Sequence, residues 1–558
     1  MLDDATSRYL RYAELVELLE KLAVRYPHLM TLGSIGRSHE GREIPVATVT
    51  NAATGPAADK PAMLVDGNIH ASEVTASAVA LHHLVSLLEG YGSDEAVTRC
   101  LDTRAFYIIP RVNPDGAEAS LSDRPRYLRS STRAYPFAEE PLSGLLFEDV
   151  DGDGRILTMR VADPFGQWKK HPDDPRIMIK RDPVEQGGEY YRLFPEGPIV
   201  NYDGATVSLF DGREGLDLNR NWPSNWRNEA IQPGAGPFPL SEPETHALAS
   251  FVSNHPNIVT WIAGHTFSGV LLRPGFTVAD DALPRGDLKF YKMVGERGTE
   301  LTGYPAISTF HSFRVNKQSE IYGSIEWAYE SMGIYMWAPE YWAPHRAAGF
   351  EVDDYAEWFY DHPEECDIKM MAWSDRELDG QGFVDWYAFD HPQLGPVELG
   401  GWDLVRGLVN PPEPLLRREV EPFTKWFTWQ HLLSPRLEMI SLSARPVGDD
   451  LWEIAAVAQN SGYLPTYGAE SARKHKLVRG CLAEIELPAG AELVKGLARE
   501  DLGQLAGRSG EVTAYWTFEG TPDRARVTWV VRAPAASTLT VTLRHARAGR
   551  IQRSVSLA

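Results

Sequence analysis

Three side chains of metal-binding type stand where apolar runs of the sequence end. His70 and Glu73 lie just beyond the run AMLV, and His265 follows the run IVTWIAG. Two imidazoles and a carboxylate, with one coordination position left for water, form a catalytic zinc site. His-x-x-Glu alone is weak evidence in a chain with 16 histidines, and a helix-capping glutamate beside a core histidine is the alternative. The place of all three residues at predicted strand ends favours the zinc site.

A second group of metal-type residues lies in the stretch EDVDGDGRI. Asp149, Asp151 and Asp153 alternate, and Gly154 permits the sharp turn of a calcium-binding loop. The twelfth position of such a loop normally carries a glutamate that binds calcium through both oxygens, whereas here it is Arg160. Calcium binding and a solvated acidic turn are therefore both consistent with this stretch.

The metal-type residues need strands and helices that hold them rigidly. Strand-like runs alternate with helical patterns through about the first 400 residues. This alternation predicts an α/β fold with a mixed central sheet flanked by helices, in which ligand sites lie at the carboxyl ends of strands. The predicted segments are a helix within 7–26 and strands over 43–51, 61–69, 105–113, 257–265 and 333–340.

From about residue 434 the pattern changes to short alternating segments separated by Gly, Pro and Asp turns. This pattern is typical of an all-β sandwich. We therefore expect a first domain over 1–433, with a polar insertion at about 117–214, and a C-terminal β-sandwich accessory domain over 434–558. The predicted sandwich strands are 437–445, 451–460, 481–487, 512–518, 526–533 and 537–546.

Composition limits the partners of the protein. With 55 basic and 77 acidic side chains the net charge is −22, which argues against nucleic acid and anionic membranes as partners. Three widely spaced cysteines suit reduced thiols. The sequence shows neither a basic N-terminal region followed by an apolar stretch nor an uncharged apolar run of about 18 residues. We therefore expect a cytoplasmic protein, and the sequence does not indicate an oligomeric state.

Several segments, in order along the chain, resemble zinc metallocarboxypeptidases of the carboxypeptidase A type. The resemblance runs through most of residues 7–400, and the motifs are specific in combination. The segments are YPHLMTLGSIGRSHEGREIPV, GNIHASE, IIPRVNPDG, GLDLNRNWP, GPFPLSEPET, GHTFSGVLLRP and YGSIEWAYESMGIYMWAPE. The resemblance implies that the first domain is a zinc carboxypeptidase-like catalytic domain.

The resemblance also implies roles for residues around the metal. His70, Glu73 and His265 look like the ligands of one zinc ion per chain. Asp217, in GLDLNRNW, looks like the carboxylate that orients a ligand imidazole. Glu340, which ends the apolar run GIYMWAPE, looks like the general base that takes a proton from water and returns it to the leaving amine.

Other residues match those that hold the substrate. Asn219 and Arg220 match the pair that grips a free C-terminal carboxylate, and a guanidinium group suits bidentate carboxylate binding. Tyr322 is the best match for the mobile tyrosine that closes over the substrate, with Tyr329 and Tyr335 as alternatives.

Two further assignments concern specificity and charge. Ile325 matches the base of the pocket for the departing residue, so an apolar or aromatic C-terminal residue is favoured, while Glu326 leaves a basic one open. A cation that polarises the scissile carbonyl is also required, and it is assigned to Arg160, with Arg155 and Arg213 as alternatives.

The implied function is that of a zinc-dependent carboxypeptidase hydrolysing the C-terminal peptide bond of small peptides. The insertion is expected to border the cleft and limit access. One alternative is an amidase that acts on cell-wall peptide fragments or acylated amino acids, since the same site could cleave them. Another is a carboxypeptidase-like binding protein without activity, although the presence of the base and all three ligands speaks against it.

Overall fold

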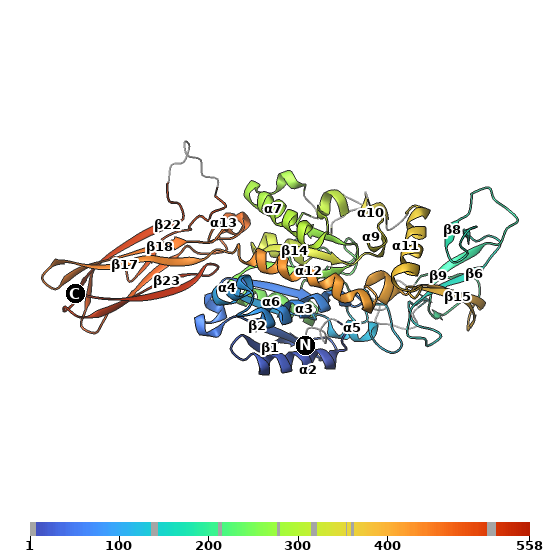
Figure 1. Cartoon of the computed structure of the whole chain (residues 1–558), viewed down its shortest axis with the longest axis horizontal. Helices are drawn as coiled ribbons and strands as arrows, with labels where there is room; N and C mark the ends of the chain where they lie inside the picture. Colours follow the sequence, from blue (N-terminus) through green and yellow to red (C-terminus); the bar gives the residue numbers. More distant parts are fainter. Residues whose placement is uncertain are drawn as a thin grey trace.

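The computed structural model describes residues 7–135, 143–209, 215–275, 279–313, 321–352, 354–358, 362–510 and 520–558. Figure 1 shows three bodies in a row. The C-terminal β-sheets form one end, an α/β body lies in the middle, and a smaller β-sheet body forms the other end. The predicted sandwich strand 512–518 lies outside the described residues.

The α/β body is built on strands that are largely apolar. These strands are β1 (Met30–Arg37), β2 (Glu43–Val49), β3 (Ala62–Gly67), β4 (Ala105–Ile109), β11 (Ile258–Thr266), β12 (Val270–Arg273), β13 (Ala306–Ser308) and β14 (Tyr335–Tyr341). Within the described ranges they form an eight-stranded mixed sheet in the order β1-β2-β4-β3-β11-β14-β12-β13. The parallel strands β3, β4 and β11 are buried along their whole length, as strands covered on both faces must be.

Helices cover both faces of this sheet. The longer ones are α2 (Tyr12–Arg25), α3 (Val74–Gly90), α4 (Glu95–Thr103), α6 (Pro243–Asn254), α7 (Arg285–Thr302), α11 (Glu364–Glu377) and α12 (Glu413–His431). Side chains of α2, α3, α4, α7 and α12 share one apolar core with alternate residues of the strands, and α6 packs in the core on the opposite face. The mixed central sheet flanked by helices confirms the predicted fold class.

Short helical segments connect these elements. They are η1 (Ala52–Thr54), η2 (Ala57–Asp59), α5 (Pro114–Ser120), η3 (Asp280–Ala282), η4 (Thr309–Phe313), α8 (Ser324–Glu326), η5 (Trp327–Ser331), α9 (Pro344–Ala347), α10 (Tyr355–Trp358), η6 (Leu404–Val409) and α13 (Glu470–Lys474). The segments α8 and η5 continue into β14, so one stretch of chain passes from the face of the sheet into a central strand.

The small β-sheet body combines two distant parts of the chain. Its strands are β6 (Thr158–Ala162), β7 (Trp168–Lys170), β8 (Met178–Lys180), β9 (Tyr191–Pro195), β15 (Phe383–His391) and β16 (Gly395–Trp402), and beside them β5 (Gly144–Leu145) pairs with β10 (Ile199–Val200). In the described residues the six strands are ordered β15-β16-β6-β9-β7-β8. The predicted polar insertion therefore pairs with a hairpin that sequence analysis did not connect to it.

The C-terminal strands form a sandwich, as predicted. They are β17 (Leu437–Gly448), β18 (Leu451–Asn460), β19 (Leu482–Glu486), β20 (Glu492–Lys495), β21 (Arg499–Asp501), β22 (Arg524–Arg532), β23 (Thr538–His545) and β24 (Gly549–Ser556). The described part makes two antiparallel four-stranded sheets, β17-β18-β22-β20 and β21-β19-β23-β24, around a shared apolar core. The predicted domain boundaries stay predictions, although β17 begins close to the expected change of pattern.

Cys100, Cys366 and Cys481 are buried free thiols. In the part of the chain that the structure describes, no helix has the length and apolar character needed to cross a membrane.

Candidate metal centre and active site

Two of the candidate metal ligands lie on the turn between β3 and α3. Asn68 adopts a left-handed conformation there, with φ of 61°, and its amide group donates to the carbonyl oxygens of His70 and Ala71. Asparagine is among the few residues that tolerate this conformation. The turn leaves His70 on the loop and Glu73 at the residue before the first turn of α3. Both side chains are buried.

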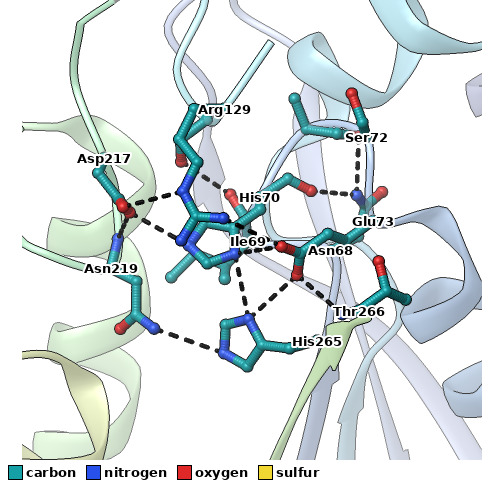
Figure 2. Close-up of polar contacts among 12 residues, drawn as sticks. Asn68, Ile69, His70, Ser72, Glu73, Arg129, Asp217, Asn219, His265 and Thr266 are labelled. Atoms are coloured by element: carbon teal, nitrogen blue, oxygen red, sulfur yellow. Dashed lines mark hydrogen bonds and ion pairs between the residues drawn. The ribbon is translucent and has the colours of Figure 1, made fainter. Parts of the chain in front are cut away.

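The third candidate ligand comes from β11 and meets the first two. His70 Nδ1 lies 2.8 Å from Glu73 Oε1, and His265 Nδ1 lies 3.1 Å from Glu73 Oε2. The two Nδ1 atoms are 3.1 Å apart. Figure 2 shows the three side chains converging beneath Arg129, and their ligand atoms all lie within 4.8 Å of one another.

This donor set fits a zinc ion. Zinc takes imidazole nitrogens and carboxylate oxygens at about 2.0–2.2 Å, so its ligand atoms must lie within a few ångströms of one another. Two ring nitrogens that face each other need a proton or a cation between their lone pairs. Burial raises the pKa of Glu73, but His70 and His265 outweigh it and hold the pKa well below its ordinary value, so the carboxylate is ionised and ready to bind a cation.

Polar neighbours orient the two imidazoles. Asp217 Oδ1 lies 3.1 Å from His70 Nε2, a distance at which a carboxylate can orient a ligand imidazole. The amide nitrogen of Asn219 lies 3.4 Å from His265 Nε2, and the backbone N–H of Thr266 donates to Glu73 Oε2. These contacts leave the Nδ1 atoms of both rings directed at the same point.

Arg129 is the cation at this cluster, and sequence analysis missed it. Its Nε donates to Asp217 Oδ2 at 3.1 Å, and its Nη1 donates to Glu73 Oε1 at 3.2 Å. The side chain remains 47% exposed, so it can also contact a ligand bound at the cluster. The segment is fixed by Ser130, whose hydroxyl donates to the Ile69 carbonyl and accepts from the Leu218 N–H.

The assignment of Arg160 as the carbonyl-polarising cation is corrected. Arg160 lies on β6 of the small β-sheet body, where its guanidinium forms an ion pair with Glu398 at 2.8 Å and stacks on Trp386. Its buried position and its partner hold it in that sheet. Of the alternatives, Arg155 pairs with Asp153, and residue 213 lies outside the described residues.

The candidate base stands beside the third ligand. In the parallel pairing of β11 with β14, His265 is in register with Glu340. Burial raises the pKa of Glu340 to about 8, against the lowering effect of His265 and nearby arginines. A carboxyl group with a pKa near neutrality can both accept and return a proton at physiological pH.

The predicted substrate-binding residues lie in two segments, 219–220 and 322–325, that contact each other. Asn219 and Arg220 are partly exposed, and the N–H of Ser324 donates to Asn219 Oδ1 at 2.9 Å. Gly323 is required there, because a Cβ at this position would lie 2.8 Å from Asn219 Oδ1. Ile325 follows in this segment and is buried in the core of the sheet.

Gln232 joins this group and was not singled out from the sequence. Its amide donates to the Arg220 carbonyl, and its Oε1 accepts the N–H of Tyr322 at 2.7 Å. Tyr322 therefore lies next to the predicted carboxylate-binding pair. The alternatives Tyr329 and Tyr335 are buried and donate their hydroxyls to Asp287, away from the cluster.

The acidic loop has the compact form that its sequence suggests. Carboxylate oxygens of Asp149, Asp151 and Asp153 lie within 4.8 Å of one another. The same carboxylates accept N–H groups of their own loop, such as those of Gly152 and Gly154 on Asp149. Calcium binding by this loop stays a prediction.

Comparison with known proteins agrees with the site. A family model described as zinc carboxypeptidase matches residues 15–354, and a model of a domain of unknown function matches 436–556. Carboxypeptidase A2 of Rattus norvegicus is 26% identical over 339 residues, which is 58% of this chain and 59% of that protein, so the match spans less than two thirds of this relative.

A second relative matches over a shorter range, and a solved structure also aligns with the chain. A zinc carboxypeptidase of Saccharothrix mutabilis subsp. capreolus is 30% identical over 116 residues, 20% of this chain and 26% of that protein. The structure of bovine thrombin-activatable fibrinolysis inhibitor aligns with 76% of this chain and 97% of that one, at 17% identity and a TM-score of 0.41. The zinc carboxypeptidase model covers more than half of the residues. The chain therefore belongs to the zinc carboxypeptidase family, which confirms the prediction from the sequence motifs.

Proposed function

We propose that this protein is a zinc-dependent carboxypeptidase that hydrolyses the C-terminal peptide bond of small peptides. The observation that carries the proposal is the register of β11 with β14, which sets a carboxyl group of pKa near neutrality beside a buried cluster of two histidines and a glutamate. A metal-binding cluster without a neighbouring proton-transfer group would suit a structural or storage site for the metal. A proton-transfer group next to it supports hydrolysis.

Different residues of the chain carry out the separate steps of hydrolysis. Zinc held by His70, Glu73 and His265 would supply a Lewis acid for the scissile carbonyl and make a water molecule more acidic. Glu340 takes a proton from the water that attacks the scissile carbonyl carbon and delivers it to the departing amine as the peptide C–N bond breaks. Arg129 donates to the oxygen on which negative charge develops, because its guanidinium is partly exposed above the cluster.

The residues beside the cluster select substrates with a free C-terminus. Arg220 and Asn219 bind the free carboxylate of the substrate, which fixes which peptide bond reaches the base. Tyr322 closes over the bound residue from the adjacent segment. Ile325 favours an apolar or aromatic side chain at the C-terminus of the substrate.

A Glu340→Gln substitution tests the proposal. We expect kcat on a blocked peptide ending in Phe to fall by about 10²–10⁴-fold, because the amide cannot accept the proton, while the zinc content stays unchanged. Glu419→Gln is the matched control: Glu419 also has a raised pKa, about 7, and it accepts the N–H of Trp342 without facing the cluster. Unchanged hydrolysis by the Glu340 variant would exclude the proposed base.

The same assay separates a carboxypeptidase from an amidase. A carboxypeptidase cleaves peptides with a free C-terminus and leaves their amidated counterparts intact. Faster turnover of acylated amino acids or cell-wall fragments than of any peptide would favour the amidase. We also retain the proposal that the protein acts in the cytoplasm, which its buried thiols support.

A further inference from the structure

Helix α3 begins at the candidate metal ligand Glu73, whose side chain makes no capping hydrogen bond to the first amides of the helix. Glu73 occupies the N-cap position of the helix. At this position a short polar side chain normally accepts the N–H of the second or third helical residue. The Glu73 carboxylate is directed at His70 and His265 instead, so the first amides of α3 need an acceptor from elsewhere.

Asn410 provides that acceptor from more than 300 residues away. Its Oδ1 accepts both the N–H and the hydroxyl of Thr75, at 2.9 and 2.8 Å. Its amide nitrogen donates to the carbonyl oxygen of Ser72 at 2.7 Å and to that of Val405 at 2.8 Å. Asn410 thus bonds the backbone on both sides of Glu73, and its side chain is fully buried.

The segment that carries Asn410 belongs to neither ligand element. It follows η6, whose first N–H, from Leu404, donates to the carbonyl of Ile156 near the small β-sheet body. It precedes Pro411, whose carbonyl accepts the hydroxyl of Tyr9. Residue 410 also lies beyond the range 15–354 matched by the family model, so this contact is supplied by the chain's own C-terminal extension of the α/β body.

We propose that Asn410 is a positioning residue for the metal ligand Glu73. By capping α3 in place of Glu73 and holding the Ser72 carbonyl, it fixes the turn over 72–75 so that the carboxylate faces the two histidines. Its removal therefore weakens zinc binding, as loss of a hydrogen-bond partner behind a metal ligand does. The inference rests on the proposed function only in taking the cluster as a zinc site.

Loss of a buried asparagine that makes four hydrogen bonds lowers stability in itself, so the test needs a control that separates stability from metal binding. Asn460 is buried in the sandwich and makes the same kinds of contact. Its Oδ1 accepts the N–H groups of Arg436 and Gly462, and its amide donates to the carbonyls of Leu464 and Ala506. Asn460→Ala removes as many hydrogen bonds as Asn410→Ala, but far from the cluster.

The experiment measures zinc affinity of the metal-free full chain by competition with a chromogenic chelator, and its Tm without metal. We expect Asn410→Ala to weaken zinc binding by about 10–100-fold. Asn460→Ala should lower the Tm and leave the zinc affinity within about twofold of wild type. Asn410→Asp keeps the acceptor for Thr75 and loses the donor to Ser72, so its zinc affinity should lie between those of wild type and Asn410→Ala.

An Asn410→Ala protein with a lowered Tm and wild-type zinc affinity would overturn the inference, because Asn410 would then be a stabilising residue only. If that variant does not fold, wild-type zinc affinity in Asn410→Asp overturns it equally. A wild-type protein that binds zinc but cleaves no peptide would refute the proposed function and leave this comparison valid. A wild-type protein that binds no zinc would refute both.

Discussion

At the scale of single residues, the site depends on which arginine reaches the cluster. Arg129 contacts Glu73 and Asp217, yet nearly half of its side chain is exposed. Arg160 is buried against Glu398 and Trp386 in another body. A cation assists catalysis only where negative charge develops, so position decides between two chemically identical side chains.

We expect Arg129→Ala to lower kcat by about 10²–10³-fold with a small change in KM, because a donor to the developing oxyanion acts in the transition state. Steady-state kinetics on the same blocked peptide measure both constants. Arg160→Ala serves as the control: it should lower the Tm and leave kcat close to wild type. Equal losses of kcat in the two variants would contradict the assignment.

The metal-type residues could be predicted from the sequence because each stands where an apolar run stops. His70, Glu73 and His265 are brought together by the strands that precede them, and strands are readable from local pattern. Arg129 has no such signal. It lies in a polar stretch whose position is fixed by contacts of Ser130 with the ligand turn and with the chain beside Asp217, and such long-range contacts leave no periodic trace.

At the scale of elements, a buried glutamate joins the acidic loop to the strands of the small β-sheet body. Glu196 follows β9, is fully buried, and accepts the N–H groups of Val150 and Leu157. Burial raises its pKa to about 7, with a contribution from Asp151 and Asp149. The unfolded chain has an ordinary glutamate pKa of 4.5, so folding favours the protonated form.

Glu196 therefore stabilises the fold at low pH and ceases to do so as pH rises. The contribution of Glu196 to the free energy of unfolding, about 3 kcal/mol, is fully present below pH 4.5 and is lost as pH rises through 7. Glu196→Gln removes this titration, so its Tm deficit relative to wild type should shrink between pH 5 and pH 8. Thermal unfolding of both proteins across this range measures the difference. A deficit that stays constant would show that Glu196 does not titrate in this window.

The strand pairing in the small β-sheet body could not be predicted from the individual elements. The strands β15 and β16 are separated from β6 by more than 200 residues, and β6 meets β16 through antiparallel backbone bonds at Arg160 and Glu398. Local pattern predicts that a segment is extended and not which distant segment it pairs with. The polar insertion was therefore recognisable, whereas its partner was not.

At the scale of the whole molecule, the sandwich is joined to the α/β body by buried polar contacts. Arg547, at the turn between β23 and β24, donates to the carbonyls of Met332 and Gly333 just before β14, and to that of Tyr467. Asp287 on α7 accepts the N–H of Glu470. Apolar residues of the sandwich segment, including Leu464 and Ala469, also belong to the core of the α/β body.

These contacts predict that the two bodies unfold together. Arg547→Ala would leave buried carbonyls without donors and lower stability by about 3 kcal/mol or more, and calorimetry should then resolve two transitions where wild type shows one. Arg544→Ala, on the adjoining strand β23, is the control, because its ion pair with Glu484 is partly exposed and should contribute little. A single transition at wild-type Tm in the Arg547 variant would refute this coupling.

The register between β11 and β14 limits where insertions and deletions in such a protein can occur. His265 and Glu340 are neighbours across one pair of parallel strands, whose backbones lie about 4.8 Å apart in any sheet. Peptide geometry therefore spaces the ligand from the base. Changes of length in the loops around α7 therefore leave this spacing unaltered. Deleting a single residue inside either strand would instead turn one of the two side chains to the opposite face.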